Sequence, residues 1–495
     1  MAKTRLFDTG RPLPVRVAAR SGAVLLAASI LSWGVAASAL ASGSRTVLPR
    51  SPLSARVPSA RVAGPGGAGT ASSFGSHSPS LTVLPNVVAD GTTSQPVNED
   101  PLTADPVTSS HLMSGGNDYS CGSLQGFYNS DDSGATWRHH CLPVVHDSGC
   151  GDPDVAYDRN GVGYVAGIDC GAVWNIVLQS TPDNGLTWGA AHVVVSSIQG
   201  GGLTDKEWME VDTSATSPHV NCIYISLTDF NSSATASRIT VSHSCNGGTS
   251  FTTVPVDTLQ SLPSLDQFSD LTVGADGTVW VSWMRCHTSG SAGDCGGTSV
   301  TMYNSKSTDG GTTWTAPTKI ADVNTAPDTC FCAYYGNLPG TSERLSNIPV
   351  IDHDASTGKL WSTFYNYSGG QTHAELASSG DGGATWTTPA VINPSGNAGW
   401  MWTATNDAGR IAVSFMFSQA AGSYFAATVL TMNGTTFVKK KSSTGGAMLF
   451  SNDGFGGGFI GDYTGGIWTG NTYHQSWMDT RSGGVSSDMT GGVAT

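Results

Sequence analysis

An eight-residue pattern, S/T-x-D-x-G-x-T-W, recurs along this chain and constrains its fold more than any other feature. Four copies match it at every key position: residues 130–137 (SDDSGATW), 181–188 (TPDNGLTW), 307–314 (STDGGTTW) and 379–386 (SGDGGATW). Residues 244–251 (SCNGGTSF) match with substitutions, and residues 434–437 keep only the second half. The closing aromatic residues lie 51 to 72 positions apart, and repetition at this scale indicates a propeller or a repeat array.

The residue types of this pattern are those of a tight turn between two strands. The Asp can accept backbone N–H groups within the turn, and the Gly can adopt a positive φ without steric cost. The closing Trp supplies a large apolar surface that can pack against the neighbouring repeat. Each copy is therefore predicted to be structural, and none of these residues needs to contact a ligand.

The five eight-residue copies resemble the Asp-box, or BNR, repeats of sialidase-type β-propellers. The resemblance covers approximately residues 98–481 and implies an all-β propeller of four-stranded blades. It is specific for fold and much less so for activity, because one propeller framework carries unrelated functions.

A second repeating pattern lies between the copies: two apolar strands joined by a turn, which reads as a β-hairpin. Seven such hairpins occur, at residues 100–116, 154–166, 208–229, 271–283, 348–367, 402–417 and 459–479. In a four-stranded blade the hairpin forms strands 1 and 2, and the eight-residue copy is the turn between strands 3 and 4. Seven blades are favoured. Six remain the alternative, because the first hairpin is the poorest copy and the sialidases that the chain resembles usually have six.

The seventh hairpin has no eight-residue copy after it. We expect residues 81–89 to supply the missing last strand, so that strands from the two ends of the chain close the ring and no sheet edge is left open.

The start of the chain has the features of an export signal. Five basic residues precede an apolar run at residues 22–35, and Ala39-Leu40-Ala41 offers a cleavage site. Residues 1–41 are predicted to be a signal peptide, with an uncleaved N-terminal anchor as the alternative. Residues 42–80, rich in Ser, Ala, Gly and Pro, are predicted to be a disordered spacer, and residues 81–495 the propeller domain.

These features predict a secreted or cell-envelope monomer that has no stable membrane span after cleavage. The formal net charge of −14 argues against nucleic acid as a partner.

All ten cysteines follow the predicted signal, and an even number in an exported chain favours disulfides. Pairing of neighbours would join Cys121 to Cys141, Cys150 to Cys170, Cys222 to Cys245 and Cys286 to Cys295. Cys330 and Cys332 are too close in sequence to pair without strain.

Blade topology predicts which residues meet at the channel mouth. If strand 1 lines the channel, residues just before strand 1 and just after strand 2 gather on the face opposite the eight-residue turns, where a ligand pocket is expected. We call this the top face. Residues before strand 1 are Glu99, Asp152, Asp205, Lys206, Glu207, Arg344, Asp462 and Tyr463, and those after strand 2 are Asp169, Asp229, Arg285, Asp479 and Arg481.

The resemblance implies roles for some of these residues. Sialidases of this family hold the substrate carboxylate with three arginines, and planar guanidinium groups suit that task. They use a Tyr paired with a Glu as nucleophile and an Asp as acid/base. By position, Arg285, Arg344 and Arg481 would form the arginine set, with Asp152 and Asp205 also binding substrate. Tyr463 would be the nucleophile, with Glu207 as its base and Asp462 completing the catalytic set.

The chain departs from the family at its first strand, where an aromatic-Arg-Ile-Pro motif is replaced by Asn98-Glu99-Asp100-Pro101. A structural interpretation of the top-face residues also stays open, in which carboxylates cap strand ends and Arg481 pairs with Asp479 or Asp462. Residues 352–356 resemble a calcium loop, but their Gly falls one place late.

The sequence therefore predicts a propeller that binds a glycan or a protein partner on its top face. A sialidase-type glycoside hydrolase is the alternative, and no metal or cofactor is expected.

Overall fold

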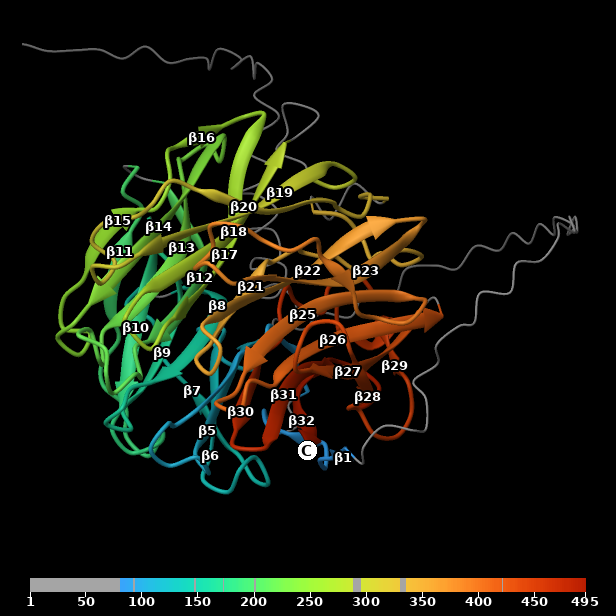
Figure 1. Ribbon diagram of the computed structural model, residues 1–495. Helices are drawn as coiled ribbons and strands as arrows, with labels where there is room; N and C mark the ends of the chain where they lie inside the picture. Colours follow the sequence, from blue (N-terminus) through green and yellow to red (C-terminus); the bar gives the residue numbers. More distant parts are fainter. Residues whose placement is uncertain are drawn as a thin grey trace, which may run out of the picture.

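The computed structural model describes residues 81–495, apart from residues 92–93, 147, 172, 200–201, 288–294, 330–334 and 421. The predicted signal peptide and spacer lie outside the described residues. The described chain folds into seven antiparallel sheets arranged around a common axis (Figure 1). This confirms the all-β propeller, and it decides the blade count in favour of seven over six.

The strands follow the predicted order of a hairpin, a third strand and an outer strand. Blade 1 contains β3 (Val97–Asn98), β4 (Leu102–Ala104), β5 (Leu112–Asp118), β6 (Gln125–Ser130) and β7 (Arg138–Cys141). Blade 2 contains β8 (Gly149–Tyr157), β9 (Gly163–Cys170), β10 (Trp174–Thr181) and β11 (His192–Ser196). Blade 3 contains β12 (Leu203–Val211), β13 (Ile223–Phe230), β14 (Ala236–Ser244), β15 (Thr252–Pro255) and β16 (Gln260–Ser261).

Blade 4 contains β17 (Ser264–Val273), β18 (Val279–His287), β19 (Ser299–Ser307) and β20 (Thr318–Asn324). Blade 5 contains β21 (Val350–Asp354), β22 (Lys359–Ser368), β23 (Gln371–Ser379) and β24 (Ala390–Val391). Blade 6 contains β25 (Asn397–Thr405), β26 (Ile411–Ala420), β27 (Ser423–Thr431), β28 (Val438–Lys441) and β29 (Met448–Leu449). Blade 7 combines both ends of the described chain: β30 (Gly466–Thr469), β31 (Thr472–Asp479), β32 (Ser487–Ala494), β1 (Thr82–Val83) and β2 (Val87–Val88).

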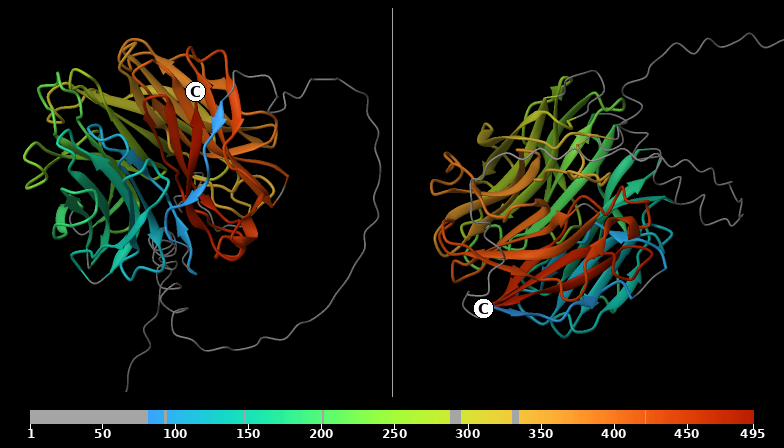
Figure 2. Two further views of the ribbon diagram at one scale, coloured as in Figure 1. Left: turned by 90° about the horizontal axis from the view of Figure 1, so that it is seen from below. Right: turned by 90° about the vertical axis from the view of Figure 1, so that its right-hand side faces the viewer.

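The closure of the ring agrees with the sequence prediction. β1 and β2 both pair antiparallel with β32, so that Thr82 lies opposite Ala494 and Val87 opposite Thr490. The C-terminus and β1 lie side by side in Figure 1, and the blue strand beside the red blade is visible again in Figure 2. The third strand of blade 7 thereby acquires a neighbour on its outer side.

The inner strands of the seven blades form a closed ring of neighbours, in the order β4, β8, β12, β17, β21, β25 and β30. Buried carboxylates join adjacent inner strands through backbone amides. Asp270 Oδ2 accepts from Ile351 N at 2.7 Å, and Asp352 Oδ2 accepts from Thr405 N at 2.5 Å. Asp154 Oδ2 accepts from Met209 N in the same manner. The predicted calcium-loop resemblance at Asp352 thus coincides with an inter-blade hydrogen bond.

The eight-residue copies lie between the third and fourth strands of their blades, on the face opposite the top face. In residues 307–314, Ser307 Oγ accepts from Gly311 N at 2.9 Å and Asp309 Oδ1 accepts from Thr313 N at 2.9 Å. Thr313 also donates its hydroxyl to Asp309, and these hydrogen bonds lower the pKa of Asp309 to about 2. The turn is therefore held by its own side chains.

Trp314 closes this turn and packs, half-buried, against apolar residues of blades 3 and 4, including Val241 and Val281. Replacing it by Ala should lower the free energy of unfolding by about 3 kcal/mol, the lower end of the range for a truncated aromatic side chain, because part of the indole is in solvent. Urea denaturation of Trp314→Ala checks this. A variant as stable as the wild type would mean that the indole contributes no packing between blades.

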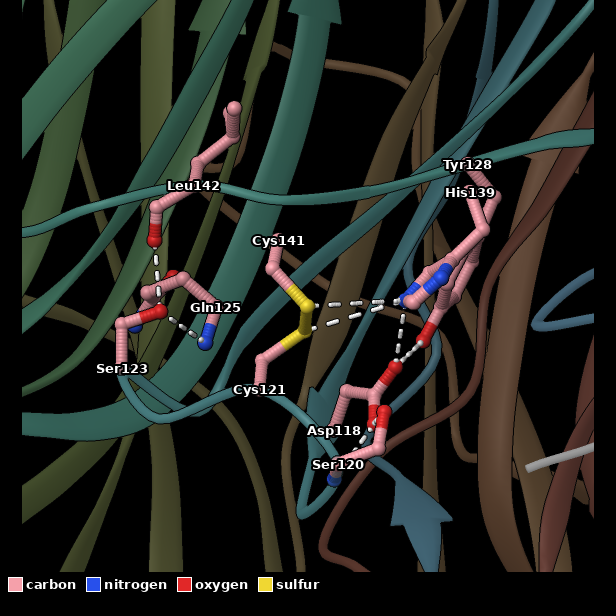
Figure 3. Close-up of a disulfide and its surroundings, with 9 residues drawn as sticks. All are labelled: Asp118, Ser120, Cys121, Ser123, Gln125, Tyr128, His139, Cys141 and Leu142. Carbon is pink, nitrogen blue, oxygen red and sulfur yellow. Dashed lines mark hydrogen bonds and ion pairs between the residues drawn. A yellow bond between two sulfur atoms is a disulfide. The ribbon is translucent and has the colours of Figure 1, made fainter.

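Four disulfides join the neighbouring cysteines as predicted: Cys121–Cys141, Cys150–Cys170, Cys222–Cys245 and Cys286–Cys295. Cys330 and Cys332 lie outside the described residues. Figure 3 shows the first of these disulfides beside His139, whose Nε2 lies 2.8 Å from Asp118 Oδ2. Four disulfides indicate that the chain folds in an oxidising, extracytoplasmic environment. No helix in the described part of the chain is long and apolar enough to cross a membrane.

The disulfides make a direct prediction for thiol chemistry. Titration of the denatured, unreduced protein should detect at most about two thiols per chain, because eight of the ten cysteines are paired. The same titration after reduction should detect ten and serves as the control. Detecting eight or more before reduction would contradict the pairing.

Candidate functional site

Five of the ten described non-glycine residues with a positive φ lie where the inner strands begin, at the top face of the channel. Asp152, Lys206, Phe268 and Trp400 each have a positive φ, and each lies at a register shift in the inner strand of blade 2, 3, 4 or 6. Glu99 has the same conformation between β3 and β4. A left-handed conformation costs a non-glycine residue about 1–3 kcal/mol and is often retained at functional sites. Its repetition marks the top of the channel as a candidate site.

Lys206 lies at the centre of this region, within a cage of three carboxylates. Its Nζ is 3.1 Å from Glu99 Oε1, 2.9 Å from Asp152 Oδ2 and 3.0 Å from Asp462 Oδ2. Arg344 Nε donates to Asp462 Oδ1 at 2.9 Å, and its Nη2 contacts the other oxygen. We call Glu99, Asp152, Lys206, Arg344 and Asp462 the top-face cluster. They come from blades 1, 2, 3, 5 and 7, so the fold alone brings them together.

Most of the cluster is withdrawn from solvent, and Arg344, 24% exposed, is its most accessible side chain. The side chain of Lys206 is 10% exposed, that of Glu99 1% and that of Asp462 0%. Burial raises the pKa of Glu99 well above its usual value, and the nearby Asp152 adds to this effect. Burial also acts to raise the pKa of Asp462, but Arg344 and Lys206 outweigh it and hold that pKa below the usual value. For Lys206, burial opposes the charge, yet the surrounding carboxylates raise its pKa. Lys206 and Asp462 are therefore charged at neutral pH.

Uncharged polar groups hold the carboxylates in position. Asn117 Nδ2 donates to Glu99 Oε2 at 2.7 Å, and the Asp462 amide donates to Glu99 Oε1 at 3.0 Å. Ser346 Oγ donates to Asp462 Oδ1 at 2.6 Å. Asn117 and Ser346 carry no charge and fit no motif, so sequence reasoning missed them.

Aromatic side chains adjoin the cluster and form what we call the aromatic rim: Tyr119, Tyr335, Phe455 and Phe459. The rings of Tyr119 and Phe455 are 5.1 Å apart, and the guanidinium of Arg344 lies 4.3 Å from the centre of the Phe459 ring. Tyr119, Tyr335 and Phe455 are half-buried, so part of each ring faces solvent. Amphipathic aromatic surface beside buried polar groups is typical of ligand sites.

The predicted catalytic residues lie near the cluster. Tyr463 is buried, donates its hydroxyl to the Pro153 carbonyl at 2.9 Å and packs edge-on against Trp208. Glu207 is 1% exposed, and neither carboxylate oxygen has a hydrogen-bond partner among the described residues. Burial raises the pKa of Glu207 well above its usual value. No hydrogen bond joins Tyr463 to Glu207 in the described structure, and their catalytic roles stay predictions.

The predicted substrate-binding residues are only partly brought together. Arg344 and Asp152 belong to the cluster, and Asp205 lies next to it, accepting from Gln267 at 2.7 Å. Arg285 instead pairs with Asp266 at 2.7 Å and with Asp257, and Arg481 pairs with Asp479, Nε to Oδ2, at 2.8 Å. The three arginines therefore contact three separate sets of carboxylates. The prediction that they bind a single substrate group stays a prediction, and these pairings do not support it.

Glu99 and Lys206 were placed on the top face by sequence but given no role there. The available signal was Glu99 itself, at the position where the sialidases that the sequence resembles have an arginine. A buried carboxylate at that position needs a cation, and Lys206, two blades farther along the chain, supplies it. The contact joins residues 107 positions apart, so no local sequence pattern predicts it.

Comparisons with known proteins complete this description. No protein-family model matches the sequence, and no curated protein matches it. Similar solved structures include a Dyadobacter fermentans protein of unknown function, with 13% identity, 69% of this chain and 93% of that chain covered, and a TM-score of 0.44. A Hadza microbial sialidase, Hz136, has 13% identity, coverage of 79% and 74%, and a TM-score of 0.43.

An α-L-arabinanase from Penicillium chrysogenum, complexed with arabinobiose, has 14% identity, coverage of 68% and 94%, and a TM-score of 0.43. Propellers that process glycans are thus among the structural neighbours. Likeness at this level does not carry a function from one protein to another.

Proposed function

We propose that this protein is an exported, sialidase-like propeller that binds a glycan at the top-face cluster. The observation that carries the proposal is the convergence of five charged side chains from five blades at the mouth of the channel. Three of the five, Glu99, Asp152 and Lys206, have a left-handed backbone. The same conformation recurs at Phe268 and Trp400, so it is a feature of the inner strands, and at Asp152 and Lys206 it aims charged side chains toward one place.

The chemistry of the site suits a sugar ligand. Buried carboxylate and amide oxygens accept hydrogen bonds from hydroxyl groups, and Asn117 and Arg344 can donate them. The partly exposed rings of Tyr119, Tyr335 and Phe455 offer a surface for the C–H face of a sugar ring. The predicted signal peptide and the four disulfides support a place outside the cytoplasm, where glycans are displayed.

The proposal is tested with residues 42–495, produced as an exported protein, on a glycan array followed by calorimetry with the best ligand. Tyr119→Ala and Phe455→Ala should each weaken binding by about tenfold or more, because each removes rim surface. Leu186→Ala is the matched control, since this side chain is 69% exposed in an eight-residue turn on the opposite face. Failure of the wild type to bind any glycan, or full binding by both rim variants, would overturn the proposal. A protein partner would then be sought.

A glycoside hydrolase is the second candidate, and Glu207 is the observation that favours it. A buried carboxyl without hydrogen-bond partners among the described residues, whose pKa is raised well above its usual value by burial, is suited to act as a general acid. Tyr463→Phe and Glu207→Gln would abolish turnover of fluorogenic sialosides or neutral glycosides while leaving the circular dichroism spectrum unchanged. Absence of turnover by the wild type on both substrate classes would remove this candidate and leave glycan binding intact.

A further inference from the structure

We infer that the top-face cluster selects glycans without acidic groups, namely neutral or amino sugars, and rejects sialic acids and uronic acids. The inference rests on the proposed function and specifies its ligand. It follows from where the cations of this chain are and from what each of them already contacts.

The arginines give the first observation. From residue 81 onward the chain has seven, and the structure describes them all. Four pair with carboxylates away from the cluster: Arg138 with Asp131, Arg238 with Asp229, Arg285 with Asp266, and Arg481 with Asp479. Arg159 and Arg410 lie in hairpin turns on the opposite face and donate to Thr213 O and Asn471 Oδ1. Only Arg344 reaches the cluster, and a site for a sugar carboxylate normally needs a free guanidinium fork.

Both cations of the cluster already contact carboxylates. An ammonium group has three N–H donors, and Lys206 has three carboxylates within 3.1 Å. Arg344 directs Nε and Nη2 at the two oxygens of Asp462, and its side chain is 24% exposed. An incoming carboxylate would therefore have to displace a buried carboxylate from Lys206 or share Arg344 with Asp462.

The charge balance opposes an acidic ligand as well. Glu99, Asp152 and Asp462 face two cations, and the buried Asp205 and Glu207 lie next to them. The region thus holds five carboxyl groups against one lysine and one arginine. A ligand carboxylate would meet like charge in a poorly screened setting, and such contacts are strongly unfavourable.

Neutral sugars avoid this repulsion because they carry no charge. Their hydroxyl groups can also donate hydrogen bonds to carboxylate oxygens of the cluster. An amino sugar would gain further from its positive charge.

The experiment compares neutral or amino glycans with acidic glycans, using the intact exported chain. Lactose is matched with 3′-sialyllactose, and chitotriose and its deacetylated form are matched with an oligogalacturonate of the same length. We expect a neutral or amino member to bind, with its acidic counterpart at least about 100-fold weaker at low salt. Raising the ionic strength should lower the ratio of the neutral ligand's affinity to the acidic ligand's affinity, because salt screens the repulsion.

Asp205→Asn and Glu99→Gln should shift the ratio toward the acidic ligand, because each removes a negative charge near the site. Asp381→Asn in an eight-residue turn on the opposite face is the matched control and should leave the ratio unchanged. Thermal melts establish which variants are folded, and Asp205→Asn, which leaves the Lys206 cage intact, keeps the test available if Glu99→Gln is unfolded. Equal or tighter binding of the acidic member would overturn the inference and keep the proposed function. Absence of binding to every glycan would instead overturn the proposed function, and the inference with it.

Discussion

A chain that begins at residue 90 should fail to fold, because it lacks β1 and β2. These strands cover the outer edge of β32, with Leu84 N donating to Gly492 O and Ala89 N donating to Asp488 O, each at 2.9 Å. Ala89 is also buried against Val97 and Tyr128 of blade 1. Losing the burial of several apolar side chains would cost roughly 5–10 kcal/mol, which is comparable with the whole stability of a typical domain, about 5–15 kcal/mol.

Circular dichroism melts and size-exclusion chromatography check this expectation. The matched control begins at residue 81, keeps the closing strands and should melt within about 3 °C of the chain that begins at residue 42. A chain from residue 90 that is monomeric and melts like this control would show that blade 7 does not need its N-terminal strands.

Lys206→Met should lower the free energy of unfolding by about 3–5 kcal/mol, the range for removing one partner of a buried ion pair. The variant leaves Asp152 without its cation in a buried site, and leaves Glu99 and Asp462 with Arg344 alone, whose Nη2 lies 4.0 Å from Glu99 Oε1. The effect should shrink as the pH falls from 7 toward 4, because protonation of the carboxylates relieves their repulsion. Urea denaturation at several pH values measures both effects.

Lys319→Met is the matched control for this prediction. Lys319 pairs with Asp322 at 2.7 Å, but both side chains are more than half exposed, at 57% and 53%. Exposed pairs contribute about 0–1 kcal/mol, so this variant should be close to wild type at every pH. If Lys206→Met were equally stable, the carboxylates of the cage would have to be protonated in the native protein.

The fold could be predicted because its signals are local. A turn such as residues 307–314 is held by hydrogen bonds between residues two to four positions apart, and its sequence therefore specifies its conformation wherever it occurs. The hairpins are equally local, and the four disulfides pair cysteines only 9 to 23 positions apart. The closing strand at residues 81–89 followed from the one blade without an eight-residue turn, because an open edge has to be covered.

For the candidate site, the sequence predicted only the face of the propeller on which the residues lie. Alternation of strands places Asp152, Lys206, Arg344 and Asp462 at the top of the channel, but the direction of each side chain depends on bulges in the inner strands. The left-handed residues at Asp152 and Lys206 re-aim their side chains, and no motif marked these positions beforehand.

The sequence by itself determined the propeller fold and the closing strand, favoured seven blades over six, and offered pairing of neighbouring cysteines as the disulfide arrangement. Only the tertiary structure decided which charges meet. Arg285 and Arg481 had the right residue type and the right face, yet each pairs with a carboxylate of its own blade. Lys206 lies among carboxylates of three other blades. The physical reason is that hairpins and turns are stabilised within a few residues, whereas an ion pair at the channel mouth joins residues that become neighbours only when the ring has closed.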